Sequence, residues 1–165
     1  YMKYVTWIFV VLLLCSLTSF VEKDVATQGL GIGDSAPDFP IKSLTEGETK
    51  ELKELKGNYV LLSFWASYDA PSRMQNALLN HALKKASHPV TMVSVSFDEY
   101  TSIFNETIRK DEIDTPNCFV ETSGEASGIY KKYSLNKGFK NFLLNERGVI
   151  IAKNITADQL SQYLN

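Results

Sequence analysis

The chain has 165 residues, of which 44% are hydrophobic and 12% aromatic, so its composition excludes a disordered chain and suffices for one domain with a sizeable core. Its 17 basic and 19 acidic residues give a formal net charge of −2. No dense basic run is present, and we therefore expect no nucleic-acid partner.

Residues 1–21 have the layout of an export signal. Lys3 precedes an apolar run over residues 4–14, and the acidic Glu22 follows shortly after it. The run predicts a signal peptide, or an uncleaved membrane anchor, because residues 4–21 approach the roughly 20 residues that span a bilayer. A buried helix is the alternative. Export would place the domain in the periplasm or cell envelope, with the membrane reached through this segment.

Cys15 follows three leucines in this segment. The sequence Leu-Leu-Leu-Cys resembles a bacterial lipobox, in which the cysteine is acylated and becomes a lipid anchor. Lipidation of Cys15, simple cleavage and an uncleaved anchor therefore stay open. Apart from Cys15 the chain has only Cys118, so no disulfide is expected within the folded domain.

Residues 22–33 are polar and rich in glycine, which predicts a linker before a domain over residues 34–165. An almost unbroken apolar run at residues 59–65 is typical of a central strand buried on both faces. Apolar residues recur at helical spacing over residues 71–85, at Met74, Ala77, Leu78 and Ala82. This pattern predicts a helix. The other expected elements are a hairpin at 39–44 and 49–52, a helical turn at 52–56, strands at 90–97, 139–144 and 149–152, and helices at 100–110, 125–133 and 156–164. This alternation predicts an α/β domain with a mixed central sheet and helices on both faces.

Three motifs in order carry a resemblance to a known family. Residues 64–73 read Phe-Trp-Ala-Ser-Tyr-Asp-Ala-Pro-Ser-Arg. This segment resembles the Phe-Trp-Ala-Ser-Trp-Cys-x-Pro-Cys-Arg segment of thioredoxin-like proteins, in the branch of the envelope thiol-disulfide oxidoreductases and peroxiredoxins. Residues 33–39 are similar to the family's Gly-x-x-Ala-Pro-x-Phe opening, and residues 142–148 to its Phe-Leu-Ile-Asp-x-x-Gly hairpin. The resemblance implies a thioredoxin-like sandwich.

The same resemblance places the family's two redox cysteines at Asp69 and Ser72 and its cis-proline at Phe139. Disulfide exchange needs a thiolate and a second, resolving thiol, which a carboxylate and a hydroxyl cannot replace. We therefore expect no dithiol activity. The peptide bond before Phe139 is predicted to be trans, since a cis bond before a residue other than proline costs about 2.5–4 kcal/mol.

Asp69 has a structural interpretation as the N-cap of the helix that follows, because Asp is among the best N-cap residues. Ser72, in the first turn, would then bond a nearby backbone group, and Pro71 is tolerated there. The alternative is an Asp69 and Ser72 catalytic pair, which lacks a histidine nearby in sequence to act as base.

The remaining polar candidates are few. Cys118 is expected to be buried and inert, with a lone peroxidatic or redox-sensing thiol as the alternative. His81 and His88 lie on different elements without a third ligand, so no metal is expected, and no motif indicates a cofactor.

Tyr68 and Phe139 are expected to face each other beside the groove that the resemblance places at the family's active site. The sequence therefore predicts an exported thioredoxin-fold protein without dithiol activity, which binds an envelope protein or peptide at this groove. The alternative is a thiol-disulfide oxidoreductase or peroxidase-like enzyme that uses Cys118 or a partner's thiols. A purely structural role is the third hypothesis.

Overall fold

The structure, a computed structural model, describes residues 25–43 and 47–164. The predicted signal or anchor, with Cys15, lies outside these residues, as do residues 44–46. Within the described ranges, no helix combines the length and apolar character that a membrane span requires.

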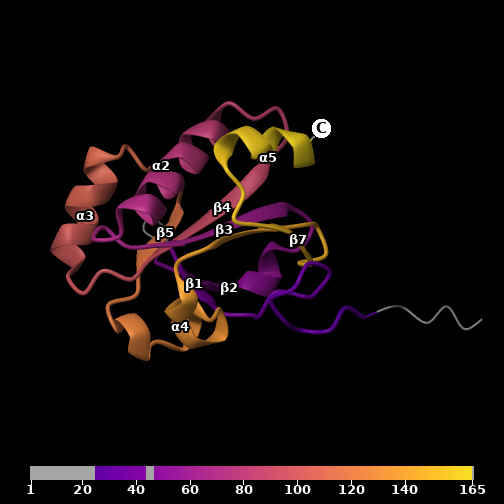
Figure 1. The fold of residues 1–165 in the computed structure, drawn as a ribbon, viewed down its shortest axis with the longest axis horizontal. Coiled ribbons are helices and arrows are strands. Elements are labelled where there is room, and N and C mark those ends of the chain that lie inside the picture. The colour runs from indigo at the N-terminus through magenta and orange to yellow at the C-terminus, as the bar shows by residue number, and fades with distance from the viewer. Residues whose placement is uncertain (1–24, 44–46, 165) are drawn as a thin grey trace, which may run out of the picture.

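Five strands form the central sheet in the order β5-β4-β3-β6-β7 (Figure 1). They are β3 (Tyr59–Trp65), β4 (Val90–Ser96), β5 (Asn117–Val120), β6 (Asn141–Leu144) and β7 (Ile150–Lys153). The strands β3, β4 and β5 are parallel, whereas β6 runs antiparallel to both β3 and β7. The predicted mixed sheet and α/β class are confirmed.

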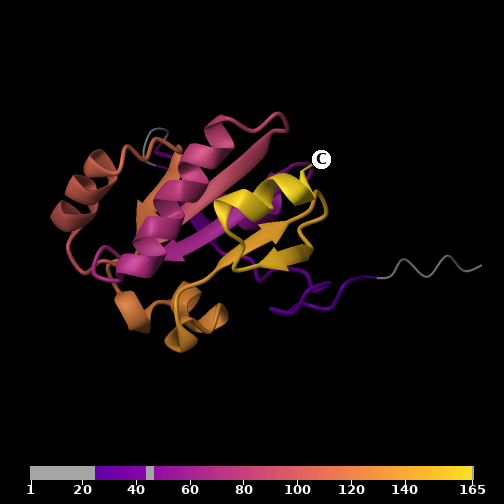
Figure 2. The ribbon, with the colours of Figure 1, turned by 45° about the horizontal axis from the view of Figure 1, so that its top comes forward.

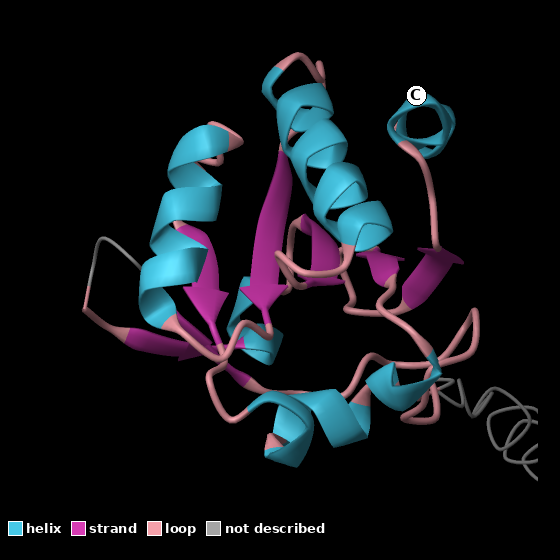
Figure 3. Cartoon of the chain, turned by 60° about the vertical axis from the view of Figure 1, so that its left-hand side comes forward, coloured by secondary structure: helices cyan, strands magenta, loops and turns pink. Residues whose placement is uncertain are grey.

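Helices cover both faces of this sheet. One face carries α2 (Ala70–Lys84), α3 (Thr101–Lys110) and α5 (Ala157–Tyr163). Figure 2 brings α2 and α5 in front of the sheet, and Figure 3 looks along α5, with α2 next to it and α3 beyond α2. The other face carries the hairpin β1 (Pro40–Lys42) and β2 (Thr49–Glu51), the 3-10 helices η1 (Leu52–Leu55), η2 (Gly124–Ala126) and η3 (Leu135–Lys137), and α4 (Gly128–Lys132).

Successive side chains of β3 point to opposite faces of the sheet and so belong to two different core clusters. Val60, Leu62 and Phe64 belong to the larger cluster under the hairpin and α4. Leu61 belongs to the cluster under α2 and α5. Burial of both sets explains why the strand is apolar at nearly every position.

The predicted helix over residues 71–85 is confirmed, but two of its apolar positions are exposed. Met74 is 58% exposed and Leu78 is 47% exposed. The buried Asn76 instead accepts a 2.8 Å hydrogen bond from Ser94 Oγ on β4, and Ser94 Oγ in turn accepts one of 2.8 Å from the indole N–H of Trp65. Two polar groups that hydrogen-bond each other can be buried, so the buried face of α2 combines polar residues with apolar ones such as Leu79.

One strand, β5, was not predicted, because its four residues follow a proline and give too short an apolar pattern. The segment predicted as a linker is bonded to the domain over part of its length. Ser35 N–H donates to Thr27 O at 2.8 Å and Gly33 N–H to Ile150 O at 2.8 Å. Backbone hydrogen bonds therefore tie this segment to the sheet and to the start of the predicted domain.

Candidate functional site

The candidate site begins where β3 ends and α2 starts. Asp69 is the N-cap of α2, and its Oδ2 accepts a 3.0 Å hydrogen bond from Ser72 N–H. Ser72 Oγ donates to Asp69 O at 3.1 Å and accepts from Ala66 N–H at 3.4 Å. The predicted capping role of Asp69 and the backbone bonding of Ser72 are confirmed. Both side chains are engaged by the local backbone.

Asp98, just beyond the end of β4, anchors the loop between β3 and α2. This carboxylate is 2% exposed. Its Oδ1 accepts hydrogen bonds from Ser67 N–H at 2.9 Å and Ser67 Oγ at 2.5 Å, and its Oδ2 accepts one from Ser96 Oγ at 2.6 Å. The loop that positions residues 67–69 is therefore fixed to the neighbouring parallel strand.

Tyr68 and Phe139 lie together, as predicted, with ring centroids 6.3 Å apart. Phe139 stacks on the buried Phe97 at 5.8 Å with an interplanar angle of 20°, and meets Tyr130 edge to face at 6.4 Å. Tyr68, by contrast, is 72% exposed. The described ranges hold no cis peptide bond, so the bond before Phe139 is trans as predicted.

A small pocket of about 190 Å³ lies between the start of α2 and the segment before β6. Asp69, Ser72 and Phe139 all line it, so the structure brings these three predicted residues together. The pocket also includes Gln75, whose Oε1 is buried without a hydrogen-bond partner, and the polar Lys140. This hollow is smaller than the roughly 300–1,000 Å³ typical of ligand sites.

A larger pocket of about 530 Å³ lies beside Tyr68. It is lined by the aromatic residues Tyr68, Phe97 and Tyr100, the acidic residues Asp98, Glu99 and Glu125, and Ser67, Ile103, Thr122, Ser123 and Gly124. Burial raises the pKa of Tyr68, and nearby Tyr130, Asp98 and Glu125 raise it further. The pocket therefore combines ring surfaces with a negative potential.

Sequence reasoning did not predict this second pocket, although one signal was present. Asp98 directly follows the apolar run of β4, and polar residues at the carboxyl ends of parallel strands commonly meet at ligand sites. Glu125 could not be placed in the same way. It lies in η2, and the position of η2 depends on β5, the strand that was not predicted.

Cys118 lies apart from both pockets, on β5. It is 1% exposed and packs with Trp65 and Phe104 under α3. Burial raises the pKa of its thiol to about 12, although a hydrogen bond with Ser94 opposes the shift. The expectation of a buried cysteine is confirmed.

The two histidines lie away from the candidate site. His81 Nε2 is 3.1 Å from Asp111 O, and His88 Nδ1 is 3.4 Å from Ser87 Oγ. Asp111 also holds Arg73 through two hydrogen bonds of 2.7 Å, a bidentate pair that joins α2 to the end of α3. In the part of the chain that the structure describes, no group of three or more His, Cys, Asp or Glu side chains could hold a metal ion.

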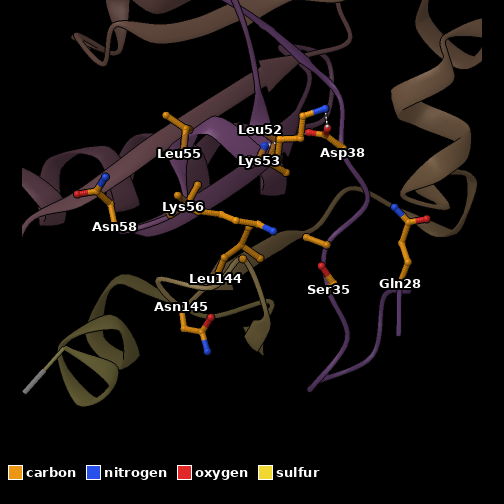
Figure 4. Close-up of a pocket in the computed structure, with 13 residues that line it drawn as sticks. Gln28, Ser35, Asp38, Leu52, Lys53, Leu55, Lys56, Asn58, Leu144 and Asn145 are labelled. Atoms are coloured by element: carbon orange, nitrogen blue, oxygen red, sulfur yellow. Dashed lines mark hydrogen bonds and ion pairs between the residues drawn. The ribbon is translucent and has the colours of Figure 1, made fainter. Parts of the chain in front are cut away.

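A third pocket, of about 210 Å³, lies at the opposite end of β3 (Figure 4). An ion pair of 3.1 Å between Lys53 and Asp38 borders it, and the Lys56 side chain extends beside Leu144. Lys56 also packs against Gly148, 3.3 Å from where a Cβ would lie. A flexible side chain partly fills this hollow, and none of the predicted site residues lines it.

A mixed five-stranded sheet, with a helix that starts after the central strand and faces the segment before β6, defines a thioredoxin-like protein. Solved structures agree. A thioredoxin-like protein from Parabacteroides distasonis ATCC 8503 is 43% identical with a TM-score of 0.72, over 84% of this chain and 98% of that one. A thiol-disulfide oxidoreductase from Bacteroides fragilis NCTC 9343 is 28% identical with a TM-score of 0.66, over 79% of this chain and 97% of that one.

The model of the AhpC/TSA family matches residues 32–153, and the chain belongs to this family. Thioredoxin-like protein YneN of Bacillus subtilis (strain 168) is 30% identical over 132 residues, which cover 80% of this chain and 74% of the relative. Thiol-disulfide oxidoreductase ResA of Bacillus cereus is 26% identical over 164 residues, which cover 95% of this chain and 92% of the relative. The predicted family resemblance is confirmed.

Proposed function

We propose that this chain is an exported member of the family that binds a protein or peptide partner beside Tyr68 and Phe139 without exchanging disulfides. The observation that carries the proposal is the start of α2. Asp69 and Ser72, at the positions where the resemblance expects thiols, are a helix cap and its backbone-bonded partner. The chain has no Cys-x-x-Cys pair anywhere in its sequence.

The alternative function is thiol-disulfide exchange or peroxide reduction through Cys118 or through a partner's thiols, which the names of the relatives favour. A buried thiol with a pKa near 12 has almost no thiolate at neutral pH and no access to a bulky substrate. Cys118 is therefore a poor nucleophile in the folded protein. Only a partner that supplies its own thiols would leave this alternative open.

Insulin reduction and peroxide consumption distinguish the two functions. We expect no turnover from the wild-type chain or from Cys118→Ser. A variant with Asp69→Cys and Ser72→Cys is the positive control, because it restores a thiol pair at a helix N-terminus, where thiol pKa values are lowered. Wild-type turnover that is lost in Cys118→Ser would contradict the proposal.

Partner binding at the aromatic pair is tested by pull-down from envelope extracts. A double variant with Tyr68→Ala and Phe139→Ala should lose the recovered partner. A second double variant with Met74→Ala and Leu78→Ala is the matched control, since it removes two other exposed apolar side chains from α2. Equal recovery by the wild type and the Tyr68, Phe139 variant would end the idea of binding there.

Export is proposed from the pattern of residues 1–21. Metabolic labelling with a palmitate analogue distinguishes the anchoring modes. If the wild type carries the palmitate label and the Cys15→Ala variant does not, Cys15 is a lipid anchor. Absence of label in the wild type, with a shortened mature chain by mass spectrometry, would instead identify simple cleavage.

A further inference from the structure

We infer that the pocket between Tyr68, Tyr100 and Glu125 receives an arginine side chain from the bound partner. This inference rests on the proposed binding function and names the chemistry of what is bound. The pocket volume of about 530 Å³ lies within the roughly 300–1,000 Å³ typical of ligand sites. It is distinct from the small pocket beside Asp69 and Ser72.

Charge complementarity is the first argument. Three carboxylates line the pocket, and among the described residues that line it none is Lys, Arg or His. Asp98 is committed to Ser67 and Ser96, but Glu99 and Glu125 are exposed. Neither of these two makes an ion pair within the described ranges, and Glu125 has a side-chain hydrogen bond only with the neutral Tyr130. Both carboxylates therefore lack a positively charged partner among the described residues.

The aromatic walls are the second argument. Tyr68 is 72% exposed and Tyr100 is 58% exposed, and both border the same hollow. A guanidinium stacks on aromatic faces and also forms paired hydrogen bonds to a carboxylate, whereas an ammonium is a compact, more strongly hydrated charge. Flat rings beside carboxylates therefore favour arginine over lysine.

The position of the pocket is the third argument. Tyr68 lines this pocket and contacts the ring of Phe139, which lines the smaller pocket, so a partner held against the aromatic pair lies close to the acidic pocket. Asp98 fixes the loop that carries Tyr68, which reduces the ordering needed on binding. One partner could therefore contact the aromatic pair and place an arginine in the acidic pocket.

Titration followed by NMR tests this inference. The ¹⁵N-labelled full chain, in a non-ionic detergent, is titrated with N-acetyl-L-arginine amide and with N-acetyl-L-citrulline amide, a neutral molecule of nearly the same shape. We expect saturable shifts of the Ser67, Tyr68 and Gly124 amides with arginine, and binding at least about fivefold weaker with citrulline.

The variants locate the binding charges. Glu99→Gln with Glu125→Gln should weaken arginine binding at least about fivefold, whereas Glu48→Gln with Glu54→Gln removes two exposed charges elsewhere and should change nothing. Equal binding of citrulline, equal binding of N-acetyl-L-lysine amide, or no effect of the first pair would overturn the inference. Disulfide exchange by the wild type would end the proposed function without altering this titration, so the two failures are distinguishable.

Discussion

Asp69 illustrates how a side chain can fit the start of a helix independently of any redox chemistry. The exposed N–H groups of the first turn favour negative charge, whether a thiolate or a carboxylate carries it. In this chain the carboxylate accepts from Ser72 N–H and begins α2. The residue therefore preserves the helix while offering no nucleophilic sulfur.

Replacement of Asp69 tests this capping role. Asp69→Ala should lower the free energy of unfolding by about 1 kcal/mol, because Ser72 N–H loses its acceptor. Asp69→Asn should stay close to wild type, since Asn caps equally well. Urea denaturation of the three proteins measures both changes. An alanine variant as stable as the wild type would show that the cap contributes nothing.

Cys118 leads to a second prediction at the scale of one residue. With a pKa of about 12 and 1% exposure, the thiol should resist iodoacetamide at pH 8 in the folded protein and react after denaturation. Peptide mass spectrometry measures the alkylation of Cys118 separately from that of Cys15. Rapid alkylation of Cys118 under native conditions would contradict this assignment and revive the enzymatic alternative.

Among the elements, the loop between β3 and α2 depends on a residue from another strand. Asp98 accepts three hydrogen bonds from Ser67 and Ser96, although its side chain is almost fully buried. Buried donors that lose their acceptor are costly, so this carboxylate holds the loop in one conformation. Both pockets of the candidate site depend on that loop.

Substitution of Asp98 should loosen this loop before it affects the rest of the fold. Asp98→Ala leaves several donors unpaired and should cost about 1–3 kcal/mol of unfolding free energy, with faster hydrogen exchange at the Ser67 amide. Asp98→Asn keeps one side-chain oxygen as acceptor and should show a smaller effect. Unchanged exchange at Ser67 in the alanine variant would argue against the anchoring role.

On the scale of the whole molecule, Tyr133 joins distant parts of the chain. It follows α4, and its ring lies 4.6 Å from that of Phe64 on β3 and 5.6 Å from that of Phe39. Its hydroxyl donates a 2.6 Å hydrogen bond to Pro37 O, before β1. Burial raises its pKa well above the ordinary value of 10.0.

This burial predicts a loss of stability in alkali. Above pH 10 the unfolded chain releases the Tyr133 proton while the folded chain keeps it, so stability falls as pH rises, by up to about 1.4 kcal/mol per pH unit. Tyr133→Phe should be about 1 kcal/mol less stable at neutral pH and show a shallower fall above pH 10. Denaturation of both proteins from pH 7 to 11 measures this. If the unfolding free energies of the two proteins fell in parallel above pH 10, Tyr133 would not be the cause of the fall.

The sequence was informative where a pattern depends on near neighbours. The buried run of β3 and the cap at Asp69 follow from local periodicity and hydrogen bonding, and both were predicted. The buried face of α2 could not be read from the sequence, because Met74 and Leu78 are apolar yet exposed, whereas the buried Asn76 finds its partner on β4. A hydrogen bond between separate elements leaves no local signal.

The sequence by itself therefore determined the family, the α/β class and the absence of a Cys-x-x-Cys pair, since these follow from motif order and residue identity. Only the tertiary structure decided that Asp98 anchors the Tyr68 loop. It also brought Glu99 and Glu125 to one pocket with two tyrosines. Burial and pocket chemistry depend on which strands lie side by side, and strand order is set by packing across the whole sheet.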